Sequence, residues 1–319
     1  MNHKKIFITG ASGCIGHYIV ESLIQNTDHE LYLLVRNPDK LRVDYKARPG
    51  INILNANLRK IDKFSSLLKE INVAILVATA WGNVQEVFDI NVVATLKLIK
   101  LLNPEICENI IYFSTASILD QNNRLLRKAG EIGTDYIRSK HDCMYQLSRL
   151  RNIPPLTCLF PTLVFGGDEE KPYSHISAGL PEIVKYIGLI KWLKVDGSFH
   201  FIHAADIAEV VSYLVENPPQ SKELQKLVLG NDKVTVNQVV EEICEYLNKG
   251  IFFRFSLAPW LIEIIILVFK IEIGVWDRFC LKYRHFTYQN PINPTTFEMP
   301  SYCSTIADIL RTRLIMNNE

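Results

Sequence analysis

Short apolar runs alternate with longer amphipathic stretches through the first two thirds of the chain. The strand-like runs are Ile6–Thr9, Leu31–Arg36, Ile51–Ala56, Val73–Ala78, Ile110–Ser114 and Leu156–Phe160. The helical patterns between and after them are His17–Gln25, Phe64–Ile71, Val87–Leu102 and Tyr136–Arg151. Short apolar strands separated by amphipathic helices are typical of βαβ units. The pattern therefore predicts an α/β fold with a doubly wound parallel sheet.

The alternation stops after Gly166 and returns once. Residues 167–200 contain many Pro, Gly and aromatic side chains. The segments that resume the pattern are His203–Glu216, Lys226–Leu229 and Val236–Leu247. We predict a dinucleotide-binding domain at 1–166, to which 201–249 returns. The remaining segments, 167–200 and 250–319, would form a smaller C-terminal substrate-binding region.

A glycine-rich turn, Thr9-Gly10-Ala11-Ser12-Gly13-Cys14-Ile15-Gly16, joins the first strand to the first helix. Small residues let the backbone approach a pyrophosphate, and the helix N-terminus offers free N–H donors. The spacing G-x-x-G-x-x-G differs by one residue from the commoner dinucleotide fingerprint. We therefore expect a Rossmann-type nucleotide site here. Its residues are Gly10, Ser12, Gly13, Cys14, Ile15 and Gly16.

The end of the second strand indicates which cofactor is favoured. A carboxylate there accepts a hydrogen bond from the adenosine 2′-hydroxyl, whereas a cation pairs with a 2′-phosphate. This chain has Arg36 at that strand end, Lys40 just beyond it, and no nearby acid before Asp39. We therefore expect NADP(H) rather than NAD(H), although a solvated arginine at a loop start is the simpler alternative.

A tyrosine and a lysine four residues apart, Tyr136 and Lys140, share one face of a predicted helix. A neighbouring ammonium lowers the pKa of a phenol toward the range useful for acid/base catalysis. An earlier apolar strand ends in Ser114-Thr115-Ala116-Ser117, which supplies hydroxyl groups for a substrate oxygen. The pattern Y-x-x-x-K alone is common in helices, so the hydroxyl segment is what makes it informative.

Six motifs follow one another in a fixed order. They are the glycine turn, Asn91–Thr95, Phe113–Ile118, Tyr136 with Lys140, Leu159–Gly166 and Phe201–Ala208. Together they resemble the extended short-chain dehydrogenase/reductase superfamily, in its NAD-dependent epimerase/dehydratase-like branch. The resemblance covers roughly residues 4–235.

The resemblance implies a role for each matching position. Tyr136 would be the general acid/base, Lys140 its electrostatic partner, and Thr115 the group that holds the substrate oxygen. Ser117 would touch substrate, and Asn91 would hold the geometry around the site. Tyr136 and Lys140 would also contact the cofactor, with Lys140 reaching the nicotinamide ribose hydroxyls. The other implied cofactor contacts are Asn57, Leu58, Ala78, Thr79, Ala80, Ser114, Pro161, Thr162 and Val164.

The chain departs from the superfamily pattern at several places. Where the superfamily has an aspartate that contacts adenine, this chain has Asn57. We therefore expect the side-chain amide of Asn57 to contact the base. Where the superfamily has a His-x-Ala-Ala segment, this chain has Val77–Trp81. Trp81 either narrows the substrate pocket or has only a packing role. A Tyr-Gly pair is replaced by Leu119-Asp120. Asp206 is expected to cap a helix rather than to act in catalysis.

The leading interpretation is an NADP(H)-dependent oxidoreductase. Hydride would pass between the nicotinamide and a carbonyl/alcohol carbon while Tyr136 gives or takes the proton on oxygen. A nucleotide-sugar epimerase or dehydratase is the alternative in the same superfamily, and Arg36 disfavours it. A non-catalytic NADP-binding scaffold or assembly factor is the alternative of another class, and the retained Tyr136 and Lys140 disfavour it.

Composition and charge argue against other classes. With 35 basic and 34 acidic side chains, a net charge of +1 offers no field that would attract nucleic acid. Seven cysteines without C-x-x-C pairs indicate neither a zinc site nor a disulfide framework, so we expect no metal and a reducing, cytoplasmic location. The basic start lacks an apolar signal region. A small-molecule substrate is the expected partner, and the resemblance allows a homodimer built on the helices at 87–102 and 136–151.

The most apolar window of the chain is 257–271 (LAPWLIEIIILVFKI). Its shortness and the charges of Glu263 and Lys270 argue against a membrane span. A buried helix of the substrate-binding region is the simpler interpretation. The alternative is an in-plane helix that contacts a membrane or a partner protein, with Trp260 at the interface.

Overall fold

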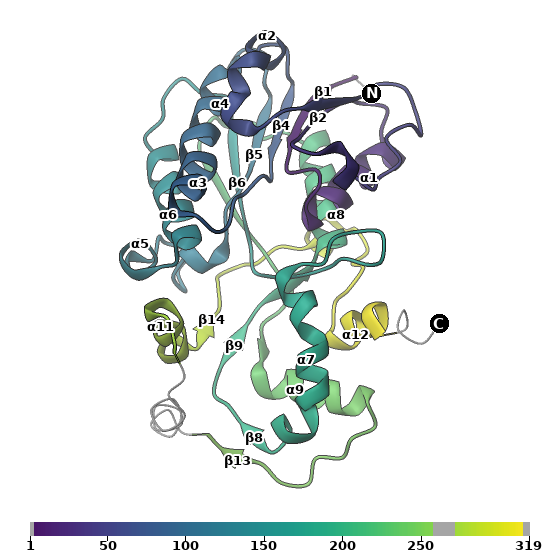
Figure 1. The fold of residues 1–319 in the computed structure, drawn as a ribbon, viewed down its shortest axis with the longest axis vertical. Helices are drawn as coiled ribbons and strands as arrows, with labels where there is room; N and C mark the ends of the chain where they lie inside the picture. The colour runs from purple at the N-terminus through teal and green to yellow at the C-terminus, as the bar shows by residue number, and fades with distance from the viewer. Residues whose placement is uncertain (1–2, 258–271, 315–319) are drawn as a thin grey trace.

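The computed structural model describes residues 3–257 and 272–314 (Figure 1). The predictions for the apolar window 257–271 therefore lie outside the described residues, except at Leu257. Within the described ranges, none of the helices has the length and apolar character needed to cross a bilayer.

Within the described residues, parallel strands form a central sheet in the order β11-β6-β5-β4-β1-β2-β3. They are β1 (Lys5–Thr9), β2 (Glu30–Val35), β3 (Ile51–Asn55), β4 (Val73–Leu76), β5 (Asn109–Phe113), β6 (Leu156–Pro161) and β11 (Gln225–Leu229). The chain builds outward from β1 to β3, then crosses back and builds outward from β4. This confirms the predicted Rossmann-type doubly wound sheet, whose order reverses between β1 and β4.

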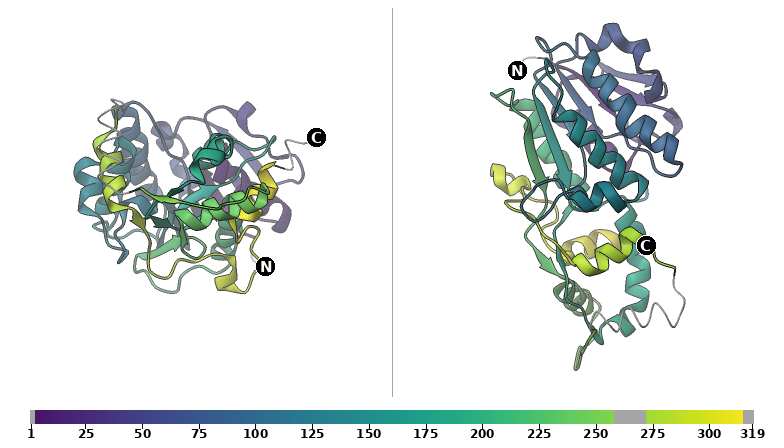
Figure 2. Two further views of the ribbon diagram at one scale, coloured as in Figure 1. Left: turned by 90° about the horizontal axis from the view of Figure 1, so that it is seen from below. Right: turned by 90° about the vertical axis from the view of Figure 1, so that its left-hand side faces the viewer.

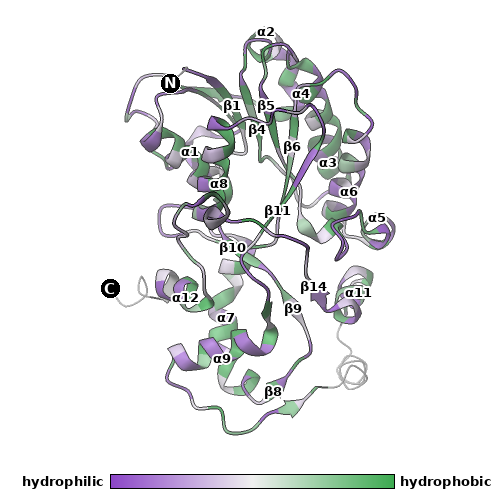
Figure 3. Cartoon of the chain, turned by 180° about the vertical axis from the view of Figure 1, so that it is seen from behind, coloured by the Kyte–Doolittle hydropathy of each residue, from purple (hydrophilic) through white to green (hydrophobic). Residues whose placement is uncertain are grey.

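The central strands are buried on both faces, which explains their continuous apolar runs. In β1, Phe7 faces one core, whereas Ile6 and Ile8 face the other. The same alternation occurs in β4, where Ala74 and Ile75 point to opposite cores. Figure 3 shows these central strands as largely hydrophobic.

Helices cover the sheet on both sides (Figures 1 and 2). One face carries α1 (Cys14–Asn26) and α8 (Ala204–Glu216), which pack against each other. The other face carries α3 (Val84–Phe88), α4 (Thr95–Leu101) and α6 (Asp135–Leu147). Two cores therefore sandwich the sheet and fix the positions of its strand ends.

The predicted helix at 87–102 is present but is not uniform. A wide π-helical segment, η3 (Asp89–Ala94), separates α3 from α4. Its widening is supported by the Thr95 hydroxyl, which donates to the Ile90 carbonyl at 2.9 Å. Such π segments often occur at functional sites, and this one contains Asn91.

A third core lies in the C-terminal lobe, between α7 (His175–Ile190), α9 (Val236–Tyr246) and α12 (Ile306–Leu314). Within 167–200, where the strand–helix alternation stops, α7 forms a helix of its own. Within 201–249, α8 packs against α1 and β11 pairs with β6 of the central sheet, whereas α9 packs against α7 and α12 (Figure 1).

The expectation that Asp206 caps α8 is wrong. The cap is His203, whose ring nitrogen accepts from the Ala205 N–H at 3.1 Å. The buried Asp206 carboxylate instead accepts hydrogen bonds from the Ser301 hydroxyl and the Tyr302 N–H, at 3.0 and 2.6 Å. This acid therefore anchors the C-terminal segment to the nucleotide domain.

Shorter elements complete the chain. The short helices are η1 (Pro38–Lys40), η2 (Leu58–Phe64), α2 (Ser65–Leu68), η4 (Ala116–Ile118), α5 (Arg127–Ile132), α11 (Val275–Tyr283) and η5 (Pro294–Phe297). The short strands are β7 (Leu163–Phe165), β8 (Leu193–Lys194), β9 (Ser198–Phe199), β10 (Phe201–His203), β12 (Val234–Thr235), β13 (Phe255–Ser256) and β14 (His285–Phe286).

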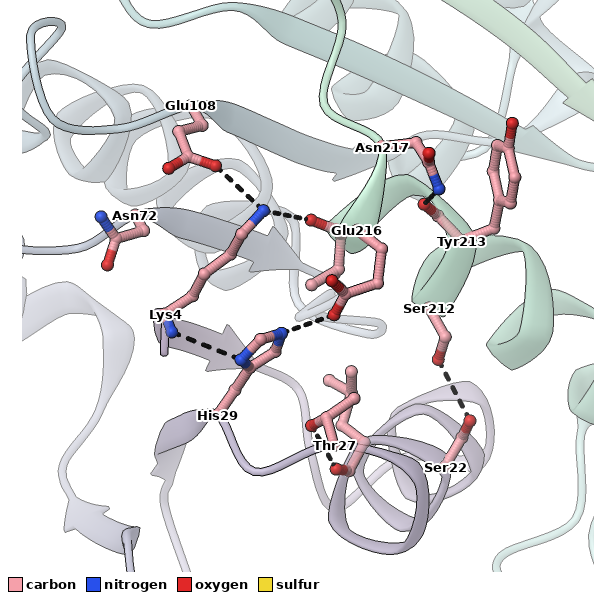
Figure 4. Close-up of polar contacts among 12 residues, drawn as sticks. Lys4, Ser22, Thr27, His29, Asn72, Glu108, Ser212, Tyr213, Glu216 and Asn217 are labelled. Carbon is pink, nitrogen blue, oxygen red and sulfur yellow. Dashed lines mark hydrogen bonds and ion pairs between the residues drawn. The ribbon is translucent and has the colours of Figure 1, made fainter. Parts of the chain in front are cut away.

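The amino end of the sheet is closed by a buried polar cluster (Figure 4). The Lys4 ammonium donates to the Val215 carbonyl at 2.7 Å and pairs with Glu108 at 3.0 Å. The Lys4 N–H donates to one ring nitrogen of His29 at 3.3 Å, and the other ring nitrogen contacts Glu216 at 2.5 Å. These contacts join β1 to the end of α8.

Candidate active site

The glycine turn lies at the carboxyl end of β1, beside the point where the strand order reverses. Gly10 has a positive φ of 78°, and its carbonyl accepts from the Gly13 N–H at 3.0 Å. A Cβ on Gly16 would lie 2.1 Å from the Gly10 oxygen, and one on Gly10 would lie 2.6 Å from the Ala78 nitrogen. Glycine is therefore required at both positions, which leaves the backbone exposed to a cleft.

This cleft, of about 760 Å³, runs from the glycine turn to the Tyr136 phenol. It brings together nearly all of the predicted site residues. They are Gly10, Ser12, Gly13, Cys14, Ile15, Gly16, Arg36, Leu58, Ala78, Thr79, Ala80, Trp81, Ser114, Thr115, Ser117, Tyr136, Lys140, Pro161, Thr162 and Val164. Asn57 does not line the cleft, because its side chain caps η2 and accepts from the Arg59 N–H at 3.0 Å.

Tyr136 and Lys140 project from α6 into the same cleft but interact with different groups. The Tyr136 phenol bonds to Thr115, and burial raises its pKa to about 12 despite this bond. The buried Lys140 ammonium donates to the Phe113 carbonyl at 2.8 Å, and burial lowers its pKa to about 8. The expected lowering of the Tyr136 pKa by Lys140 is thus not found, since desolvation dominates.

Ser114 shows that the cleft suits a polar ligand. Its hydroxyl is buried and has no hydrogen-bond partner within the described chain. A buried hydroxyl without a partner is costly, and a ligand amide in the cleft would satisfy it. Together with the bare backbone at Gly10 and Gly16, this fits a dinucleotide with its pyrophosphate at the turn and its nicotinamide near Ser114.

Asn91 holds the cleft wall against the helix that bears Tyr136. Its amide nitrogen donates to the Ser139 hydroxyl at 2.9 Å, and its oxygen accepts from the Ala80 N–H at 2.8 Å. The Thr79 hydroxyl donates to the same oxygen at 3.2 Å. Asn91 is fully buried, so these bonds tie the 78–81 loop to α6.

An indole covers the candidate acid/base group. The Trp81 ring stacks on the Tyr136 ring, with centroids 3.8 Å apart and planes 19° apart. His175, at the start of α7, lies 4.9 Å from the same indole. Trp81 therefore narrows the cleft beside Tyr136 and adds to the burial of the phenol.

The adenosine end of the cleft carries a charge pair that the sequence did not reveal. Arg36 contacts the Glu86 carboxylate at 3.3 Å, and Arg59 approaches the same carboxylate at 3.8 Å. The Arg36 and Arg59 side chains are 66% and 44% exposed and Glu86 is 36% exposed, so solvent screening weakens the pairing. The pair nevertheless places a negative group beside the cation that predicted NADP(H).

Several residues of the cleft come from segments without a recognisable motif. Trp276 of α11 and the 172–176 segment reach the cleft from the C-terminal lobe. A second cavity of about 260 Å³ adjoins the substrate side, where both cavities share Ser117, Leu163 and Trp276. Aromatic and basic side chains from remote segments line it. They are Phe199, Arg284, Phe286 and Tyr288.

A doubly wound sheet with a glycine turn at its reversal point and a tyrosine–lysine helix across the cleft defines the class of enzymes that use a nicotinamide dinucleotide. The chain belongs to the NAD dependent epimerase/dehydratase family, whose model matches residues 6–230. It is accordingly an NAD(P)-dependent epimerase/dehydratase or oxidoreductase. No curated protein sequence matches it.

Solved structures share the fold over nearly the whole chain. The structure of gox2253 has a TM-score of 0.70 and 17% identity, covering 99% of this chain and 98% of that one. UDP-N-acetylglucosamine 4-epimerase from Methanobrevibacter ruminantium M1, in complex with UDP-N-acetylmuramic acid, has a TM-score of 0.65 and 18% identity, covering 99% and 100%. dTDP-glucose 4,6-dehydratase from Bacillus anthracis, in complex with NAD, has a TM-score of 0.64 and 14% identity, covering 99% and 97%.

Proposed function

We propose that this protein catalyses hydride transfer between a nicotinamide dinucleotide and a carbonyl/alcohol carbon of its substrate, with Tyr136 as the acid/base. The observation that carries the proposal is one continuous cleft that contains the glycine turn, the Ser114 and Thr115 hydroxyls and the Tyr136 phenol. A non-catalytic scaffold would not require an acid/base group at the far end of its nucleotide cleft.

Each residue has a defined task in this scheme. The dinucleotide supplies the hydride chemistry when bound. Thr115, which bonds the phenol, would help to orient the substrate oxygen. Tyr136 would donate its proton to that oxygen during carbonyl reduction and accept one during alcohol oxidation. Lys140 would place a positive charge behind the phenol whenever it is protonated.

We infer that NAD(H) rather than NADP(H) is the preferred cofactor. The prediction of NADP(H) depended on a free Arg36, but Arg36 is paired with Glu86. A 2′-phosphate would have to compete with this carboxylate and would lie close to its charge. The dehydratase and other neighbours whose structures contain NAD support the same choice.

The substrate is larger than a simple ketone in this proposal. The second cavity continues the substrate side of the cleft and adds the rings of Phe199, Phe286 and Tyr288. Aromatic rings stack on a nucleobase, whereas the Arg284 guanidinium, which also lines this cavity, is paired with Asp196 at 2.7 Å. We therefore assign a nucleotide-diphosphate sugar as the substrate class, which makes epimerase or dehydratase chemistry the preferred form of the hydride transfer. UDP and UDP-sugar complexes of similar folds support this assignment.

The proposal is tested by incubating the protein with NAD and a panel of nucleotide-diphosphate sugars and simple ketones. Product isomers are followed by NMR, and net cofactor reduction by absorbance. Tyr136→Phe should lower turnover about 10²- to 10⁴-fold while leaving NADH affinity within about twofold, because the phenol oxygen is not needed for dinucleotide binding. Tyr145→Phe, on the same helix but exposed, is the matched control and should leave turnover unchanged.

The two parts of the proposal fail separately. Turnover that is indifferent to Tyr136→Phe would refute the acid/base assignment. Turnover of simple ketones without any of the nucleotide sugars would overturn the substrate class and leave the hydride chemistry standing.

A further inference from the structure

The strands β8 and β13 lie at the end of the C-terminal lobe farthest from the sheet (Figure 1), and the segment that contains β13 carries exposed aromatic side chains. Phe252, Phe253 and Phe255 are 89%, 56% and 60% exposed. Exposed apolar residues are common singly, but a cluster of large ones marks an interaction surface. We call this segment, 249–257, the aromatic loop.

The aromatic loop is fixed to the end of α7. The Phe255 N–H donates to the Trp192 carbonyl at 2.7 Å, and β13 pairs with β8 through Phe255 and Leu193. The Lys191 ammonium also donates to the Gly250 carbonyl at 2.9 Å. The loop is therefore a built feature of the fold.

The outer face of α7 extends the apolar surface. Ile183, Tyr186 and Leu189 are exposed along this helix, at intervals of about one helical turn. Figure 3 shows much of α7 and the neighbouring tip of the lobe as hydrophobic. The aromatic loop and this stripe thus meet where α7 ends.

The charge of this tip is mostly basic, although the exposed face of α7 carries Glu182 with Lys185. The two segments that pair there, 189–195 and 249–257, contain four basic residues and no acidic residue. They are Lys191, Lys194, Lys249 and Arg254. Arg254 is neutralised by Glu241 at 2.6 Å, whereas Lys191 lies over the Trp192 ring at 5.2 Å. Lysines beside exposed aromatic rings suit the surface of a membrane, which has anionic headgroups outside and an apolar acyl region inside.

We propose that this tip, formed by the aromatic loop and the exposed face of α7, binds the surface of an anionic lipid bilayer. The phenylalanines enter the boundary between headgroups and acyl chains, and Lys191, Lys194 and Lys249 contact the lipid phosphates. A protein partner is the less suitable occupant, because protein interfaces are depleted in lysine at their centres. In sequence, the loop leads directly into the most apolar window of the chain.

Vesicle co-sedimentation of the full chain tests the proposal. The probes are vesicles of pure phosphatidylcholine and of phosphatidylcholine with about one third phosphatidylglycerol. The wild-type chain should bind the anionic vesicles, and high salt should weaken this binding. Phe252→Ser with Phe253→Ser should reduce partitioning at least about tenfold, and Lys194→Gln with Lys249→Gln about fivefold for each charge.

Matched controls distinguish vesicle binding through the tip from non-specific adsorption of the protein. Val93→Ser with Ile106→Ser removes two exposed apolar side chains from the nucleotide domain and should leave vesicle binding unchanged. All variants should keep the wild-type melting temperature and NADH affinity. Equal binding by wild type and the phenylalanine variant overturns the proposal. So does a concentration-dependent dimer that the phenylalanine variant abolishes, since the tip would then bind a second copy of the chain.

Discussion

The two ends of the central sheet use buried polar groups in opposite ways. At the amino end, the ammonium of Lys4 and both ring nitrogens of His29 have partners inside the protein (Figure 4). At the carboxyl end, the Ser114 hydroxyl is buried without a partner in the described chain. The Lys4 and His29 groups at the amino end are thus already bonded, and the unpartnered Asn109 amide nitrogen there lies outside the cleft, whereas the unpartnered Ser114 hydroxyl belongs to a residue that lines it.

This difference separates stability from function. Polar groups that are already bonded stabilise the fold and have no capacity for a ligand. Groups left without a partner cost stability, and a ligand that supplies the missing bond recovers it. The comparison predicts that changes at the carboxyl end affect binding and turnover, whereas changes at the amino end affect unfolding.

The largest effect is expected from Gly16→Ala. The new Cβ would lie 2.1 Å from the Gly10 oxygen, so the turn must move away from the position that holds a pyrophosphate. NADH affinity, measured by fluorescence titration, should fall at least about 100-fold. Gly179→Ala is the matched control, because a Cβ on this helical glycine meets nothing within 4 Å. It should leave affinity unchanged, and an equal loss in both variants would contradict the steric argument.

Lys4→Met tests the amino end. Removing the ammonium leaves the Val215 carbonyl and Glu108 without their buried partner, which should lower the free energy of unfolding by about 2–3 kcal/mol. The measurement is urea denaturation, with NADH affinity unchanged. The neighbouring Lys5→Met removes a more exposed pair with Glu70 and should cost less than about 1 kcal/mol. Comparable losses would mean that the buried cluster adds nothing beyond a surface pair.

Local sequence was sufficient for the parts of the site that depend on local geometry. The glycine turn follows from its position between a strand and a helix, and Tyr136 with Lys140 from one helical face. All of these residues line the same cleft. The parallel sheet then brings the strand ends to one edge, so Ser114 and Thr115 join them without further information.

Long-range contacts could not be predicted in this way. Glu86 pairs with Arg36 across fifty positions, and no local pattern marks either as a partner. Trp276 reaches the cleft from the C-terminal lobe. Asp206, positioned like a helix cap in the sequence, binds residues 301–302 instead. Each of these contacts depends on how the C-terminal segments and loops pack, which periodicity does not encode.

The pH dependence of alcohol oxidation tests how far burial controls the pKa of Tyr136 at the carboxyl end of the sheet. Because burial raises the Tyr136 pKa to about 12, the phenolate needed as a base is scarce at neutral pH. The kcat/KM for oxidation should rise about tenfold per pH unit from pH 6 toward 8. Reduction needs the protonated phenol and should show no such rise. A plateau already present at pH 6 would mean that Lys140 controls the phenol, as the sequence alone suggested.

The smallest effect concerns the charge pair at the adenosine end. Glu86→Gln removes the carboxylate that pairs with Arg36 and frees its guanidinium for a 2′-phosphate. NADPH affinity should increase about three- to tenfold relative to NADH, and more at low salt, because the groups are partly exposed and screened. Glu105→Gln removes the same charge from a position outside the cleft and should leave the ratio unchanged. If the wild-type protein already prefers NADPH and Glu86→Gln does not alter the ratio, the pairing has no part in cofactor choice, and the arginine alone determines it.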